Sequence, residues 1–297
     1  MNKIVKRDPD QKDACKLSLN EFNCYHQSGF SLIELMIAIS LGLLLFGILM
    51  EMFITNQNGL KIQTALYGMQ DSAKTAISIL TSEMHRAGAI GCARLSADFP
   101  VTSFHEYEIN RANRIRVTPA NEIIVRYASY PNAFVYESMQ NNKTVYTDNA
   151  DHFAAGDILL ISNCKQAEIF QAASVRNKNG LQELVTSAPL HNQYEKYSEV
   201  SRLVINKLFI NKTGRKNSDG SDIYSLFVED IHRNKTELVS GINQMRMTFT
   251  LDMGGKLQEV QQQEINNWAQ VVGIAIDMDV SANAMQKTWH MYAALQG

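Results

Sequence analysis

Hydrophobic residues run almost without interruption from Phe30 to Met50, and Glu34 is the only charged residue among them. About 20 apolar residues are enough to cross a lipid bilayer as an α-helix. A carboxylate held deep in lipid costs roughly 2.5–3.5 kcal/mol, so Glu34 is an expensive residue for a plain membrane anchor. An ionisable side chain in such a segment therefore indicates a functional site.

The apolar run passes into an amphipathic pattern that no proline interrupts. Apolar residues recur every three or four positions, as on one face of an α-helix: Ile62, Leu66, Met69, Ala73, Ala76, Leu80, Met84 and Ala87. We therefore predict one helix over residues 30–87, ended by Gly88 and Gly91. Its apolar face is expected to pack against the protein's own globular domain, and a long coiled coil is the alternative.

From residue 98 onward, short β-type runs alternate with polar stretches rich in Asn, Asp, Gly and Pro. The predicted strands are residues 122–127, 133–136, 157–162, 168–175, 224–228, 244–251 and 272–281. Residues 141–151 and 211–222 are predicted to be polar loops. The predicted fold class is α+β, with one long N-terminal α-helix, membrane-spanning and then amphipathic, packed on a C-terminal antiparallel β-rich domain.

The start of the apolar run has the sequence Gly-Phe-Ser-Leu-Ile-Glu-Leu, residues 29–35. It resembles the cleavage site of type IV prepilins and of type II secretion pseudopilins. The resemblance implies that a prepilin peptidase cuts between Gly29 and Phe30, that Phe30 is then N-methylated, and that Glu34 acts in filament assembly. The alternative is an ordinary signal anchor. A secretory signal peptide fits less well, because its apolar core is ~7–15 residues long and precedes a small-residue cleavage site.

This pilin-like resemblance divides the chain into four parts. Residues 1–29 would be a cytoplasmic leader that is removed, and residues 30–54 the transmembrane and filament-core part of the helix. Residues 55–90 would be the amphipathic half of the helix, and residues 91–297 a β-rich periplasmic or surface domain. The chain would lie in the inner membrane with a cytoplasmic N-terminus before assembly. After assembly it would lie in the periplasm or in a pilus on the cell surface.

Four later segments resemble the PilW family of minor pilins. They are residues 88–92 (Gly-Ala-Ile-Gly-Cys), 156–164 (Gly-Asp-Ile-Leu-Leu-Ile-Ser-Asn-Cys), 166–171 (Gln-Ala-Glu-Ile-Phe-Gln) and 268–276 (Trp-Ala-Gln-Val-Val-Gly-Ile-Ala-Ile). The resemblance implies a structural subunit that helps to initiate and assemble a type IV pilus near its tip, and hence twitching motility and cell adhesion. Its partners would be the prepilin peptidase/methyltransferase, other minor pilins, the major pilin, a PilY-type tip adhesin and the inner membrane.

Two other functions remain open. One is a minor pseudopilin of a type II secretion system, resembling GspJ. The other is a membrane-tethered module whose β-domain binds DNA or a surface. The whole chain carries a net charge of −2, and removing the five basic and four acidic residues of the leader leaves −3. Composition therefore gives no strong electrostatic signal for nucleic-acid binding.

The four cysteines divide into two pairs. Cys15 and Cys24 would leave with the leader, whereas Cys92 and Cys164 would lie outside the cytoplasm, where disulfides persist. We therefore expect a Cys92–Cys164 bridge, with two buried free thiols as the alternative. Metal binding is less favoured, because no CxxC motif or histidine cluster accompanies these cysteines.

The sequence contains no catalytic signature. The seven histidines are scattered singly, and no HExxH motif, P-loop or GxSxG motif occurs. We therefore expect a structural protein without enzymatic activity, cofactor or metal. Residues 217–222 (Asn-Ser-Asp-Gly-Ser-Asp) faintly suggest an oxygen-rich calcium loop, and a polar surface turn explains them equally well.

Overall fold

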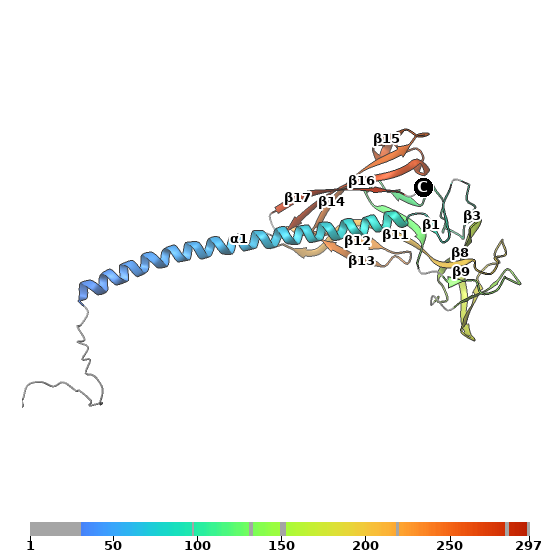
Figure 1. Cartoon of the computed structure of the whole chain (residues 1–297), viewed down its shortest axis with the longest axis horizontal. Coiled ribbons are helices and arrows are strands. Elements are labelled where there is room, and N and C mark those ends of the chain that lie inside the picture. Colours follow the sequence, from blue (N-terminus) through green and yellow to red (C-terminus); the bar gives the residue numbers. More distant parts are fainter. Residues whose placement is uncertain are drawn as a thin grey trace, which may run out of the picture. The chain divides into compact units, whose positions relative to one another are not determined.

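The chain divides into two units, Met1–Asn58 and Gly59–Gly297. The structure, a computed structural model, describes residues 31–96, 98–130, 133–148, 153–217, 220–282 and 285–295. A single helix, α1 (Leu32–Arg86), contains 55 residues and contributes to both units. The remaining elements all belong to the second unit (Figure 1).

Both ends of α1 follow from local chemistry. At the start, the backbone N–H groups of Glu34 and Leu35 donate to the carbonyl oxygen of Ser31 at 3.0 and 3.1 Å. At the end, Gly88 has a φ of +80°, a left-handed conformation that glycine adopts without strain. Its N–H donates to the carbonyl oxygen of Arg126 at 2.9 Å, which ties the end of the helix to a strand. The predicted long helix is thus confirmed.

The second unit contains three β-sheets. The smallest is the hairpin of β1 (Ala89–Ile90) and β2 (Ala93–Arg94), directly after the helix. A four-stranded sheet has the order β15-β14-β16-β17, and all its neighbouring strands are antiparallel. Its strands are β14 (Ile242–Asp252), β15 (Leu257–Val260), β16 (Val271–Ala282) and β17 (Met285–Ala294). Two short 3₁₀ helices, Gln262–Glu264 and Trp268–Gln270, connect β15 to β16.

The largest sheet has eleven strands, with β13-β12-β11-β8-β9-β10-β7 as its main path. Its central strand is β11 (Glu199–Lys216), which pairs with β6 and β8 near its start and with β5 and β12 further along. The pairings are antiparallel except that of β3 with β9. The other bounds are β3 (Val101–Thr102), β4 (Ile115–Val117), β5 (Ile123–Ala128), β6 (Ala133–Phe134), β7 (Thr144–Asp148), β8 (Ile158–Asn163), β9 (Gln166–Lys178), β10 (Leu181–Thr186), β12 (Asp222–Glu229) and β13 (Lys235–Ser240).

The main hydrophobic core lies between α1 and the two large sheets (Figure 1). The helix contributes small and flexible side chains on one face: Met69, Ala73, Ala76, Leu80, Met84 and then Ala87 just beyond its end. Ala73 and Ala76 are small enough to let the helix backbone approach the sheets closely. From the four-stranded sheet, Phe249 adds an edge-to-face contact with Trp268, with ring centroids 5.4 Å apart. The amphipathic face of the predicted helix is therefore a core face.

Strand β8 separates two further cores. Leu159 and Ile161 face one of them, and Ile158 and Leu160 face the other. Successive side chains of a strand point to opposite faces of a sheet, so a strand buried on both faces has a continuous apolar sequence. This explains why residues 157–162 were a clear strand prediction.

Three predictions for the chain are wrong in detail. Residues 141–151 were predicted to be a loop, but β7 pairs there with β10. Residues 211–216 were also placed in a loop, whereas β11 continues to Lys216 because Lys212 and Thr213 bond across to β12. Ile62 and Leu66, predicted to face the core, are 52% and 39% exposed, and the buried face begins at Ala65.

Candidate assembly segment

Glu34 lies in the first turn of α1, where a negative charge interacts favourably with the positive end of the helix dipole. Its side chain is exposed and forms no hydrogen bond or ion pair with any residue that the structure describes. Gly29 and Phe30 lie outside the described residues. Of the predicted assembly residues, the structure therefore places Glu34 alone, at the start of the helix.

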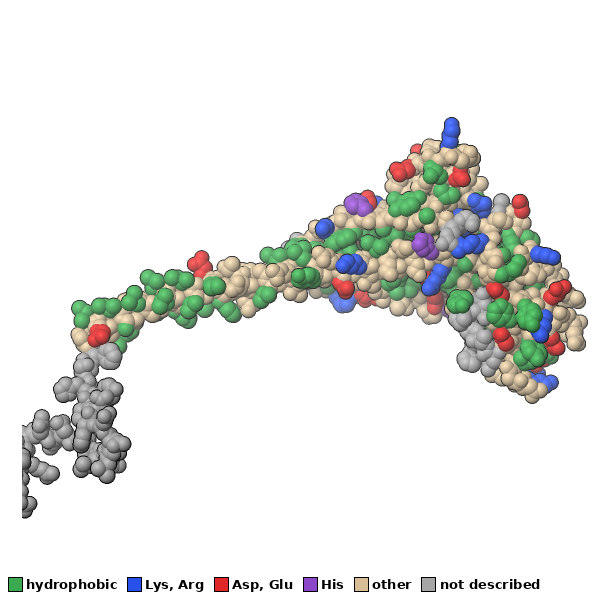
Figure 2. Space-filling model, viewed as in Figure 1, with side chains coloured by type: hydrophobic (Ala, Val, Ile, Leu, Met, Phe, Trp, Pro, Cys, Tyr) green, Lys and Arg blue, Asp and Glu red, His purple; other side chains and the backbone are tan. Residues whose placement is uncertain are grey.

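The described part of the first unit, residues 31–58, is helix with every side chain exposed. The large apolar side chains between Leu32 and Ile54 are 45–77% exposed, and because they fill most positions of the run they lie all around the helix. Figure 2 shows the apolar side chains on one face of this segment. Such a helix is stable when lipid or other protein covers it. The Ser40 hydroxyl donates to the carbonyl oxygen of Ile37 at 2.9 Å, so this polar group is satisfied within the helix. Among the described residues, α1 is the one helix long and apolar enough to span a membrane.

A polar contact holds the C-terminal half of α1 on the large sheet. The Tyr127 hydroxyl donates to Glu83 Oε1 at 3.1 Å, and Asn206 Nδ2 donates to Glu83 Oε2 at 2.9 Å. Burial, followed by the charge of Glu83, raises the pKa of Tyr127 to about 12, so the phenol keeps its proton and remains a donor. These three residues lie far apart in sequence, and no local pattern indicated that they meet.

Cys92 and Cys164 form a disulfide, with their Cα atoms 5.6 Å apart. Cys92 lies in the turn between β1 and β2, and Cys164 lies in the turn between β8 and β9. The bridge therefore ties the segment that leaves α1 to the centre of the largest sheet. With a sequence separation of 72, it is worth ~4 kcal/mol in the chain-entropy description of disulfide stabilisation. The predicted pairing is confirmed.

Close packing around Gly91, the residue before Cys92, supports this disulfide. Gly91 has a φ of +82°, and a Cβ there would lie 2.7 Å from the Ser162 hydroxyl and would also collide with the Glu199 carboxylate. The same Ser162 hydroxyl donates to the carbonyl oxygen of Ile90 at 2.9 Å. Gly91 was predicted to help end the helix, but it lies beyond β1 in the turn of the hairpin, where it permits close approach of the hairpin to the sheet.

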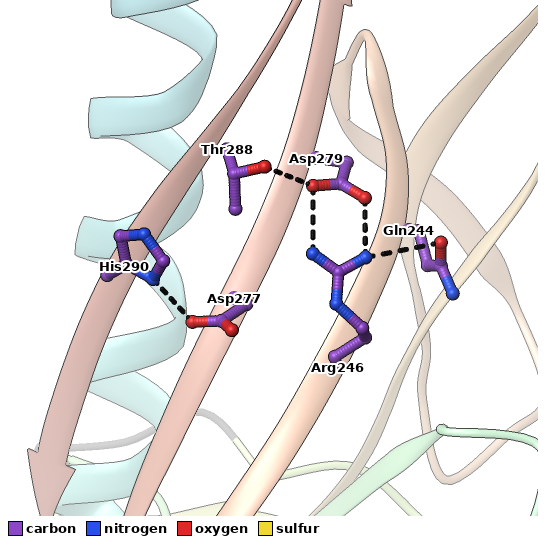
Figure 3. A network of polar contacts seen from close by, with 6 residues as sticks. All are labelled: Gln244, Arg246, Asp277, Asp279, Thr288 and His290. Carbon is purple, nitrogen blue, oxygen red and sulfur yellow. Dashed lines mark hydrogen bonds and ion pairs between the residues drawn. The ribbon is translucent and has the colours of Figure 1, made fainter.

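An ionic network occupies the outer face of the four-stranded sheet (Figure 3). Arg246 donates two hydrogen bonds to Asp279, at 2.6 and 3.1 Å, and the Thr288 hydroxyl donates a third at 2.6 Å. Beside them, His290 Nδ1 lies 2.6 Å from Asp277 Oδ1. The charges are paired on neighbouring strands, which is an arrangement that stabilises a sheet. No group of three or more His, Cys, Asp or Glu residues suited to a metal ion occurs within the described ranges.

Comparison with known proteins gives one match. Residues 24–50 match the family described as "Prokaryotic N-terminal methylation motif". No curated protein and no solved structure matches the chain. A methylation motif of the type IV prepilin kind is thus present, followed by a long apolar helix and an antiparallel β-rich domain. Together these features define a type IV pilin- or pseudopilin-like protein with a pilin-like α+β fold.

Proposed function

We propose that the chain is a structural minor pilin of the PilW kind. A prepilin peptidase would process it, and it would take part in initiating a type IV pilus within a minor-pilin complex near the tip. The observation that carries this proposal is the combination of a methylation motif with a helix that is apolar and exposed on all sides. Lipid would cover that helix before assembly, and helices of other subunits would cover it afterwards.

The proposed role is that of a structural subunit, without catalysis or a cofactor. Its proposed partners are the prepilin peptidase/methyltransferase, other minor pilins, the major pilin and a PilY-type tip adhesin, with the inner membrane as the site from which it is assembled. The exposed apolar residues of the first unit support contacts with neighbouring helices. The β-rich second unit would be the part presented outside the membrane.

Glu34 would direct the entry of the subunit into the filament. A carboxylate in the apolar segment is costly, and the cost falls when it meets a cation. The cation proposed here is the methylated α-amino group of a neighbouring subunit. At ~4 Å and an effective dielectric constant of about 20, such a pair is worth about 4 kcal/mol before the cost of desolvation. The neighbour need not be a second copy of this chain.

The decisive experiment compares two isosteric substitutions on the same helix. Glu34→Gln removes the charge at the start of the apolar run, and Glu51→Gln removes the charge of another exposed glutamate, directly after the end of the run. We expect Glu34→Gln to lower surface pilus number, whereas Glu51→Gln should leave it near the wild-type value. Processing of the precursor and protease resistance of the β-domain should be unchanged in both variants.

Three results would contradict this role of Glu34. They are normal pilus number in the Glu34→Gln strain, an equal loss of pili in both strains, and a protease-sensitive β-domain. The last of these would show that the substitution acts on folding. Normal pili together with a defect in type II secretion would instead favour the pseudopilin.

A further inference from the structure

A surface hollow of about 520 Å³ lies beside the last turns of α1. Its lining comprises Ser78, Thr81, Ser82, His85 and Arg86 from one face of the helix, together with Arg94 from β2. The disulfide at Cys92 lies between the helix and β2 in sequence and fixes the hairpin that carries Arg94. The hollow therefore combines three hydroxyl groups with three basic side chains on fixed elements.

No carboxylate lines this basic hollow. Among the residues that the structure describes, neither His85 nor Arg94 has a hydrogen bond or an ion pair from its side chain. Arg86 lies over the Tyr127 ring, with its Cζ atom 5.9 Å from the centroid. Glu83, on the same helix, already binds Tyr127 and Asn206. Basic side chains gather over the end of α1 in the space-filling view (Figure 2).

The basic surroundings extend below the hollow. Burial lowers the pKa of Arg114, and the positive charges of Arg111 and Arg94 lower it further. Arg94 and Arg111 therefore lie near enough to Arg114 for their positive charges to act on it. Arg114 is itself buried and donates to the carbonyl oxygen of Val271 at 3.2 Å, so the exposed arginines Arg86 and Arg94 are the ones that a ligand could reach.

Helix stability alone does not explain the cluster. Basic residues in the last turn interact favourably with the negative end of the helix dipole, which accounts for His85 and Arg86. Arg94 lies on β2 and therefore gains no stabilisation from the helix dipole. Its exposed guanidinium lines the same hollow as that of Arg86, and an anionic ligand that joins the two guanidinium groups would account for this arrangement.

We propose that the basic hollow binds an acidic polypeptide segment of a neighbouring subunit, with carboxylates paired to Arg86 and Arg94. This inference rests on the proposed function, which supplies the neighbour. Two arginines can each hold a carboxylate through paired hydrogen bonds, and the three hydroxyls can donate to further carboxylate or carbonyl oxygens. The hollow is open and its basic groups are exposed, so it suits a protruding chain segment.

A nucleic acid fits the hollow less well. Its phosphates repeat along an extended line and demand a row of cations, and single strands also stack on aromatic side chains. The hollow has two arginines and one histidine at one place, and no aromatic residue lines it. An acidic peptide is therefore the favoured ligand, and an oligonucleotide serves as a separate arm of the test.

The test measures binding to the full-length chain in uncharged detergent micelles. The probe is a fluorescent decapeptide of alternating glutamate and alanine, compared with the lysine-alanine peptide, inorganic phosphate and a single-stranded oligonucleotide. Arg94→Glu should weaken glutamate-peptide binding about tenfold, because a repulsion replaces an attraction. Lys178→Glu makes the same charge change at the exposed end of β9 and should weaken it less than about twofold.

The outcomes separate this site from the proposed function. Saturable glutamate-peptide binding that weakens with salt and is selectively lost in Arg94→Glu would support the acidic-segment site. Three results would overturn it: no binding, equal loss in Arg94→Glu and Lys178→Glu, or tighter binding of phosphate or the oligonucleotide. Pilus number in the Glu34→Gln strain does not depend on this assay, so either proposal can fail alone.

Discussion

Asp279 is a nearly buried carboxylate on an otherwise open sheet face, with 7% of its side chain exposed. Hydrogen bonds from Arg246, followed by the one from Thr288, hold the pKa of Asp279 below its usual value (Figure 3). Because the folded pKa is depressed, the ionised form stabilises the folded state above the unfolded pKa of ~3.9. That contribution is lost as the pH falls through the folded pKa.

We therefore predict that Asp279→Asn lowers the free energy of unfolding at neutral pH by about 1 kcal/mol, and that the difference from wild type shrinks in acid. The measurement is thermal unfolding of the full chain in detergent from neutral pH to below pH ~4. The matched control is Asp277→Asn, two residues away on the same strand face but more exposed, which should change stability less. A loss in Asp279→Asn that is the same at every pH would contradict this assignment.

Helix α1 changes its environment along its length. Its described residues up to Asn58 are all exposed, and the first buried side chain of the helix is that of Ala65. Periodicity alone could identify the apolar face, because the spacing continues from Ile62 to Ala87. Periodicity could not show at which residue the helix becomes buried, because that depends on how far the two sheets extend along the helix.

Truncating a fully buried helix residue should be costly. We predict that Leu80→Ala lowers the free energy of unfolding of the β-rich unit by about 2–5 kcal/mol, because it leaves a cavity between α1 and the sheets. Ile62→Ala, on the same helix but half exposed, should cost less than about 1 kcal/mol. Denaturant unfolding of the full chain in detergent, followed by tryptophan fluorescence, measures both. Equal costs for the two substitutions would show that Leu80 does not carry the core contact.

The strands differ in how well sequence indicates them. Strands β8 and β16 have uninterrupted or alternating apolar residues, and both were predicted nearly to their ends. Strand β17 was not predicted, because its first half contains the exposed polar residues Gln286 and Lys287 and its buried residues begin only at Met291. Strand β11 was not predicted, because Lys, Asn and Arg interrupt its apolar residues and its polar end depends on pairing with β12. Cross-strand contacts such as the Lys212–Asp222 ion pair stabilise such a strand, and they exist only in the folded chain.

The two units differ in what they need from their surroundings. The second unit contains its own cores and a disulfide, whereas the described part of the first exposes apolar residues on every side. The methylation motif could be predicted from residues 29–35, because its signature is local in sequence. The Glu83 contact and the basic hollow could not, because each joins α1 to residues that only the tertiary fold brings near.

Processing between Gly29 and Phe30 is the step on which the proposed filament role depends. The most direct measurement is the intact mass and N-terminal fragment masses of this chain recovered from sheared pili. The chain should begin at Phe30 and carry one added methyl group. In a Gly29→Val strain, the chain should stay in the membrane fraction with its 29 leader residues attached. A chain in the pilus fraction that still begins at Met1, or that lacks the methyl group on Phe30, would contradict processing and methylation at this motif.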